Sequence, residues 1–222
     1  MKLIAHRGGR GFGDDNTLEA MEKAVGSGVR MIETDVRVSA DGQLVICHGA
    51  TVSGHIVSRI TYDELKRSEP ERPLLVEILN RLANSVAFNL EIKDAPVRAV
   101  GETIEMYGIE KRTLVTSFDD SFLCEFRKEF PGVRIGYLYR MSYSRDGKMD
   151  NASATGAEVL LPFLHSIDPE LVYLAHQEGL DVYAWTVNNE EDLDRLYELG
   201  VDAVITDRFV DLKRALGKNY TT

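Results

Sequence analysis

Short apolar runs of strand length alternate with amphipathic stretches of helix length along the whole chain, and this alternation limits the possible folds more than any other feature. The apolar runs predict strands at residues 2–5, 31–36, 44–47, 88–92, 113–116, 134–138, 159–162, 182–187 and 203–206. The amphipathic stretches predict helices at residues 17–26, 74–83, 97–107, 120–130, 169–178 and 190–198. Asn16 is expected to cap the first helix, with Glu19 completing a capping box.

Strand followed by helix, repeated about eight times, predicts a parallel sheet covered by helices. Such a sheet is either open and doubly wound or closed into a (β/α)8 TIM barrel, and the number of repeats favours the barrel. No internal repeat or linker divides the chain, so we expect a single domain over residues 1–222. Its one irregularity is a polar, turn-rich segment at about residues 49–72, which we expect to be a short insertion after the strand that ends at His48.

Two carboxylates, Glu33 and Asp35, lie inside the apolar run at residues 31–36. Alternate side chains of a strand share a face, so both carboxylates are expected to point to the same side. Neighbouring carboxylates in a buried place repel each other and lose their hydration. Ion pairs with Arg30 and Arg37 would compensate for this cost, and so would a bound cation.

Polar residues also mark the ends of other predicted strands, and these residues are His6, Arg7, His48, Glu91, Lys93, Trp185, Asn188, Thr206 and Asp207. The carboxyl ends of parallel strands meet at one edge, where functional residues gather. Taken singly, each residue has a structural explanation, since a lone histidine at a strand end is more often a hydrogen-bonded structural residue. Three buried carboxylates at one edge, however, need a cation or several basic groups beside them.

The residue types at this edge suit metal-assisted phosphate chemistry. Three carboxylates and water are hard oxygen ligands, which suit Mg²⁺ or Ca²⁺. Arg7 and Lys93 would add positive charge that can hold a phosphoryl group. Two histidines, His6 and His48, can supply an acid and a base near neutral pH. The set predicts cleavage of a phosphodiester, without assigning acid and base between the two histidines.

The composition limits the binding partners and the cellular location that we expect. The 222 residues carry 36 acidic and 26 basic side chains, a formal net charge of -10, which argues against nucleic acid or anionic membrane as the main partner. We find no signal peptide ahead of His6 and no apolar stretch long enough for stable membrane insertion. Cys47 and Cys124, without zinc-type spacing, fit a reducing compartment. We expect a cytoplasmic protein with a small-molecule ligand, and the sequence carries no signal for an oligomeric state.

Several segments together carry a family resemblance over nearly the whole chain. They are AHRGGRG, DNTLEAMEKAVGSGVRMIETDVRVSADGQLVICHG, ITYDELKRS, PLLVEILNRL, NLEIKD, SF, AWTVNN and DAVITDR. In residue types and spacing they resemble the glycerophosphodiester phosphodiesterases. The resemblance implies a TIM barrel that hydrolyses a small-molecule glycerophosphodiester to an alcohol and sn-glycerol 3-phosphate, with one divalent cation, Mg²⁺ or Ca²⁺, as cofactor.

The resemblance also implies residue roles. The metal ligands would be Glu33, Asp35 and Glu91. The acid–base pair would be His6 and His48, and Arg7 and Lys93 would hold the phosphate. Asn16, Phe118 and Trp185 would line the substrate pocket.

The sequence departs from the family pattern at Gly49, which follows His48 where the family usually has Asp. The segment GATVSGHIVSRI of the insertion also differs from the sequence usual in the family. We therefore expect this chain to share the family's chemistry more closely than its substrate. The alternatives are a lysophospholipase D-like cleavage on the same barrel and a phosphate-ester-binding barrel of reduced activity. A barrel that binds a partner protein, with a purely structural charged cluster, is a third.

Overall fold

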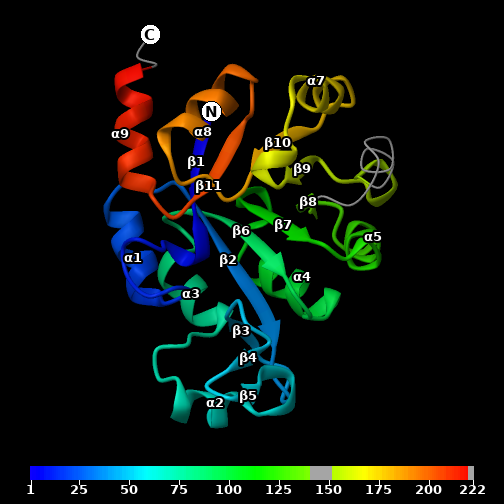
Figure 1. The fold of residues 1–222 in the computed structure, drawn as a ribbon. Coiled ribbons are helices and arrows are strands. Elements are labelled where there is room, and N and C mark those ends of the chain that lie inside the picture. Colours follow the sequence, from blue (N-terminus) through cyan, green and yellow to red (C-terminus); the bar gives the residue numbers. More distant parts are fainter. Residues whose placement is uncertain (141–151, 220–222) are drawn as a thin grey trace.

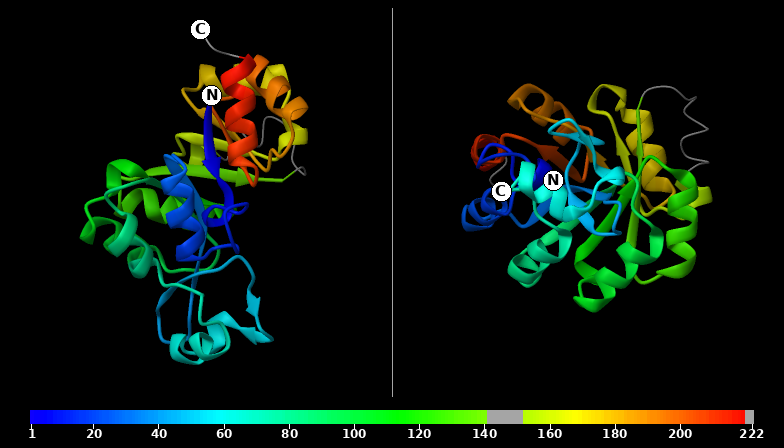
Figure 2. Two further views of the ribbon diagram at one scale, coloured as in Figure 1. Left: turned by 90° about the vertical axis from the view of Figure 1, so that its left-hand side faces the viewer. Right: turned by 90° about the horizontal axis from the view of Figure 1, so that it is seen from below.

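The computed structural model describes residues 1–140 and 152–219. In this part of the chain, eight parallel strands form the barrel: β1 (Lys2–Ala5), β2 (Met31–Val38), β6 (Ala87–Ile92), β7 (Thr113–Ser117), β8 (Arg134–Tyr139), β9 (Val159–Pro162), β10 (Asp181–Ala184) and β11 (Ala203–Thr206). The strands pair in the order β1-β11-β10-β9-β8-β7-β6-β2, and the pairing of β1 with β2 at Ala5 and Ile32 closes the ring. The predicted TIM barrel is confirmed (Figures 1 and 2).

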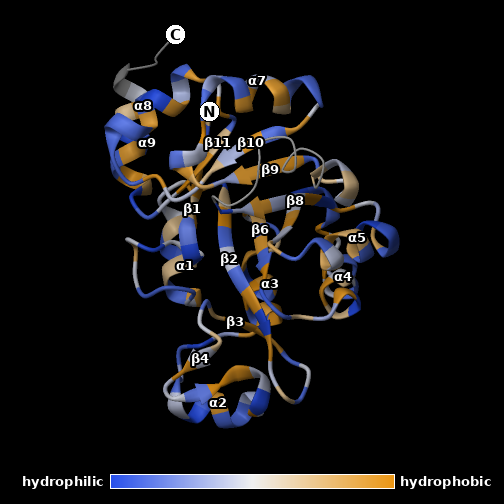
Figure 3. Ribbon diagram, turned by 45° about the vertical axis from the view of Figure 1, so that its right-hand side comes forward, coloured by the Kyte–Doolittle hydropathy of each residue, from blue (hydrophilic) through white to orange (hydrophobic). Residues whose placement is uncertain are grey.

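Helices surround the barrel: α1 (Leu18–Gly26), α3 (Leu75–Leu82), α4 (Val97–Met106), α5 (Asp120–Glu129), α7 (Pro169–Gln177), α8 (Glu190–Glu198) and α9 (Phe209–Asn219). Short 3-10 turns complete the frame at η1 (His6–Gly8), η3 (Glu110–Arg112) and η4 (Leu164–Ser166). Figure 3 shows hydrophobic residues along β6 and β9 and a mixture of hydrophilic and hydrophobic residues along the helices. The helices therefore turn one apolar face to the barrel and a polar face to solvent. None of the helices described here is long and apolar enough to span a bilayer.

The core has two apolar layers that follow the period-two alternation of the strands. On β9, Val159 and Leu161 belong to a cluster with Ile4, Tyr183 and Ile205, whereas Leu160 belongs to the larger cluster that includes the helices. On β2 and β6 the alternation places polar residues opposite the apolar ones. The neighbouring strands align Glu33 with Asn89 and Asp35 with Glu91. This register places the functional side chains at one end of the barrel.

The cap predicted for the first helix is wrong by one residue. Thr17 has extended backbone and accepts a hydrogen bond from the Ala20 amide, so Thr17 caps α1. Asn16 has a φ of 58°, which does not suit an N-cap, and its side chain bonds elsewhere.

The strand predicted at residues 44–47 is not a barrel strand. It forms β3 (Leu44–Ile46), which runs antiparallel to β2 and aligns Val36 with Ile46. The connection at residues 39–43 contains Asp41 and Gly42, a hairpin signal, and it is too short for the crossover that parallel strands require. The excursion from the barrel therefore begins with the β2–β3 hairpin.

The rest of the excursion consists of β4 (Thr51–Val52), β5 (His55–Ile56), η2 (Val57–Arg59) and α2 (Tyr62–Ser68). It has its own small apolar cluster of Val45, Cys47, Val57 and Leu65. A capping box at Thr61 and Glu64 starts α2. Figures 1 and 2 show the excursion extending from the end of the barrel to which β2 points.

Candidate active site

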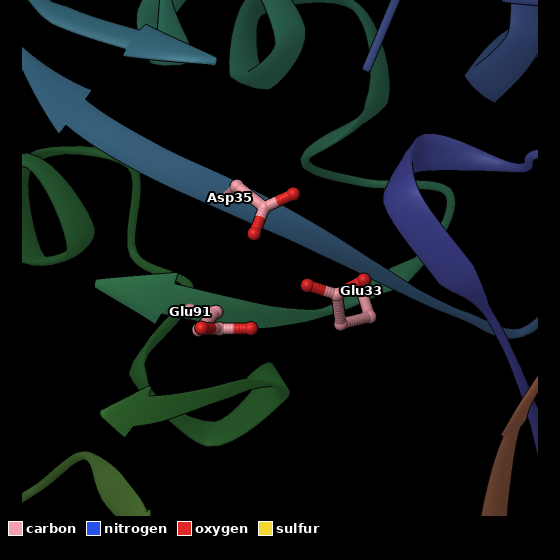
Figure 4. A group of neighbouring side chains, drawn as sticks. All are labelled: Glu33, Asp35 and Glu91. Carbon is pink, nitrogen blue, oxygen red and sulfur yellow. The ribbon is translucent and has the colours of Figure 1, made fainter. Parts of the chain in front are cut away.

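Three carboxylates from two neighbouring strands converge at the end of the barrel. Glu33 and Asp35 come from β2 and Glu91 from β6, and one oxygen of each lies within 4.8 Å of the others. Figure 4 shows the three side chains gathered on one side of these strands. Glu33 and Asp35 are buried, at 2% and 1% exposure. The sharing of a face predicted from the sequence is confirmed, and it includes Glu91.

The electrostatics of this cluster favour a cation. Burial raises the pKa of Glu33 well above its usual value, and the charges of Asp35 and Glu91 add to the effect. Burial also raises the pKa of Glu91, against the opposing charge of Lys93. Among the residues described, the buried Oε1 atom of Glu33 has no hydrogen-bond partner. An unpaired buried carboxylate oxygen among hard oxygen donors fits a divalent cation.

Lys93 supplies positive charge to the same cluster. Its Nζ atom lies 2.9 Å from Oδ1 of Asp35 and also contacts Oε1 of Glu91. Burial alone would raise the pKa of Asp35, but Lys93 and a hydrogen bond from Asn16 lower it below its usual value. Lys93 therefore contacts two of the three carboxylates and not Glu33.

Asn16 is fully buried next to Asp35. Its Nδ2 donates to Oδ2 of Asp35 at 2.9 Å, and its Oδ1 accepts from the Thr34 hydroxyl at 2.6 Å. Its backbone amide donates to the Arg7 carbonyl at 2.8 Å. The Asn16 side chain thus orients Asp35 through Nδ2, and the Thr34 hydroxyl on Oδ1 holds the Asn16 amide in place.

His6 follows β1 and lies between two carboxylates. Its Nδ1 atom lies 2.7 Å from Oδ1 of Asp207, and its Nε2 atom lies 3.8 Å from Oε2 of Glu33. Asp207 is itself held by Asn188, whose Nδ2 donates to Oδ2 of Asp207 at 2.7 Å. Burial opposes ionisation of Asp207, but the bonds from His6 and Asn188 lower its pKa below the usual value.

Sequence reasoning placed Asn188 and Asp207 at strand ends but gave them no role. The signal was their position after the last two strands, because closure of the barrel pairs β11 with β1 and so places Asp207 beside His6. The glycine-rich loop after His6 packs against the same place. A Cβ on Gly11 would lie 2.4 Å from the Asp207 carbonyl oxygen, and Gly11 has a φ of 95°.

Arg7 contacts the carboxylate cluster through its backbone. Its amide donates to Oε2 of Glu33 at 2.8 Å, with the residue in the left-handed region at a φ of 46°. Its guanidinium points to Asp15, with Nη1 3.2 Å from Oδ2. The structure therefore places Arg7 beside the cluster but pairs its charge with Asp15.

His48 reaches this region by a route that differs from the predicted one. Antiparallel β3 returns the chain along β2, and the Cys47 amide donates to the Asp35 carbonyl at 3.0 Å. The His48 side chain is exposed, and its imidazole makes no hydrogen bond with another described residue. Burial of part of the ring lowers the pKa of His48, and the charges of Arg7 and Lys93 act in the same direction, against that of Asp35.

Phe118 and Trp185 lie together at the side of the site. Their ring centroids are 5.8 Å apart with the planes at 81°, and the Trp185 indole donates to the Leu161 carbonyl. A cavity of about 530 Å³ begins at Lys93 and is lined by Ile92, Lys93, Ser117, Phe118, Asp119, Asp120, Ser121 and Tyr137. Most of these lining residues are polar, so the cavity suits a small polar group.

Comparisons with known proteins agree with this arrangement. Residues 6–211 match the model of the glycerophosphoryl diester phosphodiesterase family. A glycerophosphodiester phosphodiesterase of Caldanaerobacter subterraneus is 32% identical, covering 92% of this chain and 93% of the relative. One of Bacillus altitudinis is 30% identical, covering 93% and 94%.

Solved structures share the fold. The crystal structure of a protein from Silicibacter pomeroyi, described as a glycerophosphoryl diester phosphodiesterase, has a TM-score of 0.87 at 29% identity, covering 98% of this chain and 93% of that one. An Oleispira antarctica phosphodiesterase, solved with the product sn-glycerol-3-phosphate, has a TM-score of 0.89 at 24% identity, covering 97% and 96%. The resemblance found in the sequence motifs is confirmed, and this chain belongs to the glycerophosphoryl diester phosphodiesterase family.

Proposed function

We propose that this protein hydrolyses glycerophosphodiesters to an alcohol and sn-glycerol 3-phosphate, using one divalent cation. The observation that carries the proposal is the convergence of Glu33, Asp35 and Glu91 beside the His6 imidazole. Family membership and the activity for which the two bacterial relatives are named support the same reaction.

Glu33, Asp35 and Glu91 would hold the cation, and their hard oxygen atoms suit Mg²⁺ or Ca²⁺. When bound, such an ion neutralises charge on phosphoryl oxygens and acts as a Lewis acid. Asn16 would orient Asp35 for this task, a role we propose in place of direct substrate contact because the side chain is fully buried. Lys93 and Arg7 would add positive charge around the phosphate, Lys93 from its position beside Asp35.

The two histidines would move the protons. The lowered pKa of His48 favours its neutral form, which can take a proton from the attacking hydroxyl, either water or the substrate's own glycerol hydroxyl. Asp207 accepts the Nδ1 proton of His6, which leaves Nε2 on the side of the carboxylate cluster. As an imidazolium, His6 would donate its Nε2 proton to the departing alcohol oxygen as the phosphorus–oxygen bond breaks, and it would keep its Nδ1 proton on Asp207.

The cavity beside Lys93 would receive the alcohol part of the substrate, with Phe118 and Trp185 at its side. Its serine and aspartate lining favours a small polar alcohol as the leaving group.

We further propose that residues 1–222 form one catalytic domain that acts in the cytoplasm on a small molecule. The net charge of -10 supports a substrate other than nucleic acid. Both cysteines are free thiols, which supports a reducing compartment.

The test is hydrolysis of sn-glycero-3-phosphocholine, followed by coupled detection of sn-glycerol 3-phosphate, with EDTA and with added Mg²⁺ or Ca²⁺. Activity is expected to disappear with chelation and to return with one of the ions. His6→Ala is expected to lower turnover by ~10²–10⁴-fold, whereas His176→Ala, on the exposed side of α7, serves as the matched control. A His6→Ala enzyme as active as the control would refute the assignment.

A further inference from the structure

The backbone of His48 is held by a side chain that has no part in the proposed chemistry. Nε and Nη2 of Arg37 both donate to the His48 carbonyl oxygen, at 3.1 and 3.0 Å. Arg37 lies on β2, two residues after Asp35, and its side chain is 13% exposed. The two donors form a planar fork, so they restrain both the direction and the length of the contact with the carbonyl oxygen.

The third side of the same guanidinium is tied to the end of β6. Nη1 of Arg37 donates to Oδ2 of Asp94 at 2.5 Å, and the other oxygen of Asp94 accepts from the Val38 amide at 3.1 Å. Asp94 directly follows Lys93 in the chain. One guanidinium therefore connects the end of β3 to the strands that carry the carboxylate cluster.

The residue after His48 gives no side-chain support. A Cβ at Gly49 would lie 2.8 Å from the Thr51 carbonyl oxygen, so the tight turn excludes a side chain at this position unless the backbone shifts. The His48 imidazole makes no hydrogen bond with another residue of 1–140 or 152–219. Its location therefore depends on its backbone, which the Cys47 amide and the Arg37 fork hold against β2.

We propose that Arg37 is a positioning residue for His48. Its hydrogen bonds to the His48 carbonyl set the position of the imidazole relative to Asp35 and Lys93, and Asp94 holds the guanidinium in place. The inference rests on the proposed catalytic role of His48. Lysine cannot replace arginine here, because an ammonium is a point charge without the fork that reaches one carbonyl and one carboxylate together.

A double-mutant cycle tests this role. The enzymes are the wild type, Arg37→Ala, His48→Ala and the double variant, with kcat and KM for sn-glycero-3-phosphocholine and calorimetric affinity for Mg²⁺ or Ca²⁺ as readouts. Arg37→Lys is included in case the alanine variant does not fold. Arg98→Ala is the control, since Arg98 also pairs with a carboxylate, that of Glu129, but at an exposed position on α4.

Arg37→Ala is expected to lower kcat on the order of 10²-fold, the cost of a small misplacement, with KM and metal affinity unchanged. Arg37→Lys is expected to recover only part of this loss. In the His48→Ala background, loss of Arg37 is expected to have no further effect, because Arg37 acts only through His48.

Three results would overturn the positioning role alone. The first is an Arg37→Ala enzyme with the kcat of the Arg98→Ala control while His48→Ala retains only a small residual kcat. The second is an additive loss in the double variant, and the third is a weakened metal affinity; either would mean that Arg37 supports the whole site. An active His48→Ala enzyme would instead refute the proposed function of His48, and the inference with it.

Discussion

The Nδ1 atom of His6 lies 2.7 Å from an oxygen of Asp207, although the two residues are 201 positions apart in the chain. A carboxylate on one ring nitrogen fixes the tautomer and the orientation of an imidazole. The second oxygen of Asp207 is held by Asn188, so the carboxylate cannot turn away without losing both bonds.

Asp207→Asn is expected to lower kcat by about 10–100-fold, because an amide oriented by Asn188 no longer holds the proton on Nδ1 of His6. Asp211→Asn, which loses an exposed pair with Arg208, should keep wild-type kcat. Steady-state kinetics of both variants check the prediction. Equal kcat values in the two variants would show that Asp207 has no influence on His6.

Saturating Mg²⁺ or Ca²⁺ should raise the melting temperature, because an ion held by Glu33, Asp35 and Glu91 binds the folded chain. At a hundredfold excess over Kd the gain is about 2.7 kcal/mol, and each kcal/mol corresponds to roughly 2–4 °C for a chain of this size. Glu91→Gln should lose most of this shift. Scanning calorimetry with and without EDTA is the measurement, and a wild-type protein indifferent to both ions would contradict it.

Asn16→Ala is expected to destabilise the fold by about 1–3 kcal/mol, because Thr34 and Asp35 lose a buried partner. It should also weaken metal binding by about 10–100-fold, since Asp35 is no longer oriented. Asn189→Ala, which removes the cap of α8, should cost about 1 kcal/mol and leave metal affinity unchanged. Denaturant unfolding and calorimetry distinguish the two asparagines. Unchanged metal affinity in Asn16→Ala would separate Asn16 from the metal site.

The raised pKa of Glu33 predicts how the stability of the metal-free protein depends on pH. Because the folded pKa lies above the unfolded value near 4.5, the fold prefers the protonated form. This stabilisation is fully present below the unfolded pKa and is lost as the pH rises through the folded pKa.

In EDTA, Glu33→Gln should therefore be more stable than the wild type at neutral pH, since glutamine resembles the protonated side chain. The difference should shrink as the pH falls toward 4.5. Denaturant midpoints of both proteins across this range provide the measurement. A stability difference that does not change with pH would contradict the prediction.

Local periodicity accounts for the features that the sequence predicted correctly. Apolar runs of strand length separated by amphipathic helices were enough for the barrel, because only a parallel sheet buries such runs on both faces. The shared face of Glu33 and Asp35 follows from the pleat of a single strand. Glu91 joins them because its own strand ends at the same edge.

Contacts between segments far apart in the sequence decided the details of the site. The contact between His6 and Asp207 exists because the last strand closes the ring against the first. Asn16 was expected to cap a helix, but its backbone turns left-handed and sends its amide to Asp35. The sequence by itself determined the barrel and the carboxylate cluster, which depend on strand periodicity. The antiparallel β3 had a local signal in the short connection through Asp41 and Gly42. Only the tertiary structure decided that Asp207 reaches His6 and that Arg37 links the His48 carbonyl to Asp94, because these contacts join segments whose separation along the chain says nothing about their distance in space.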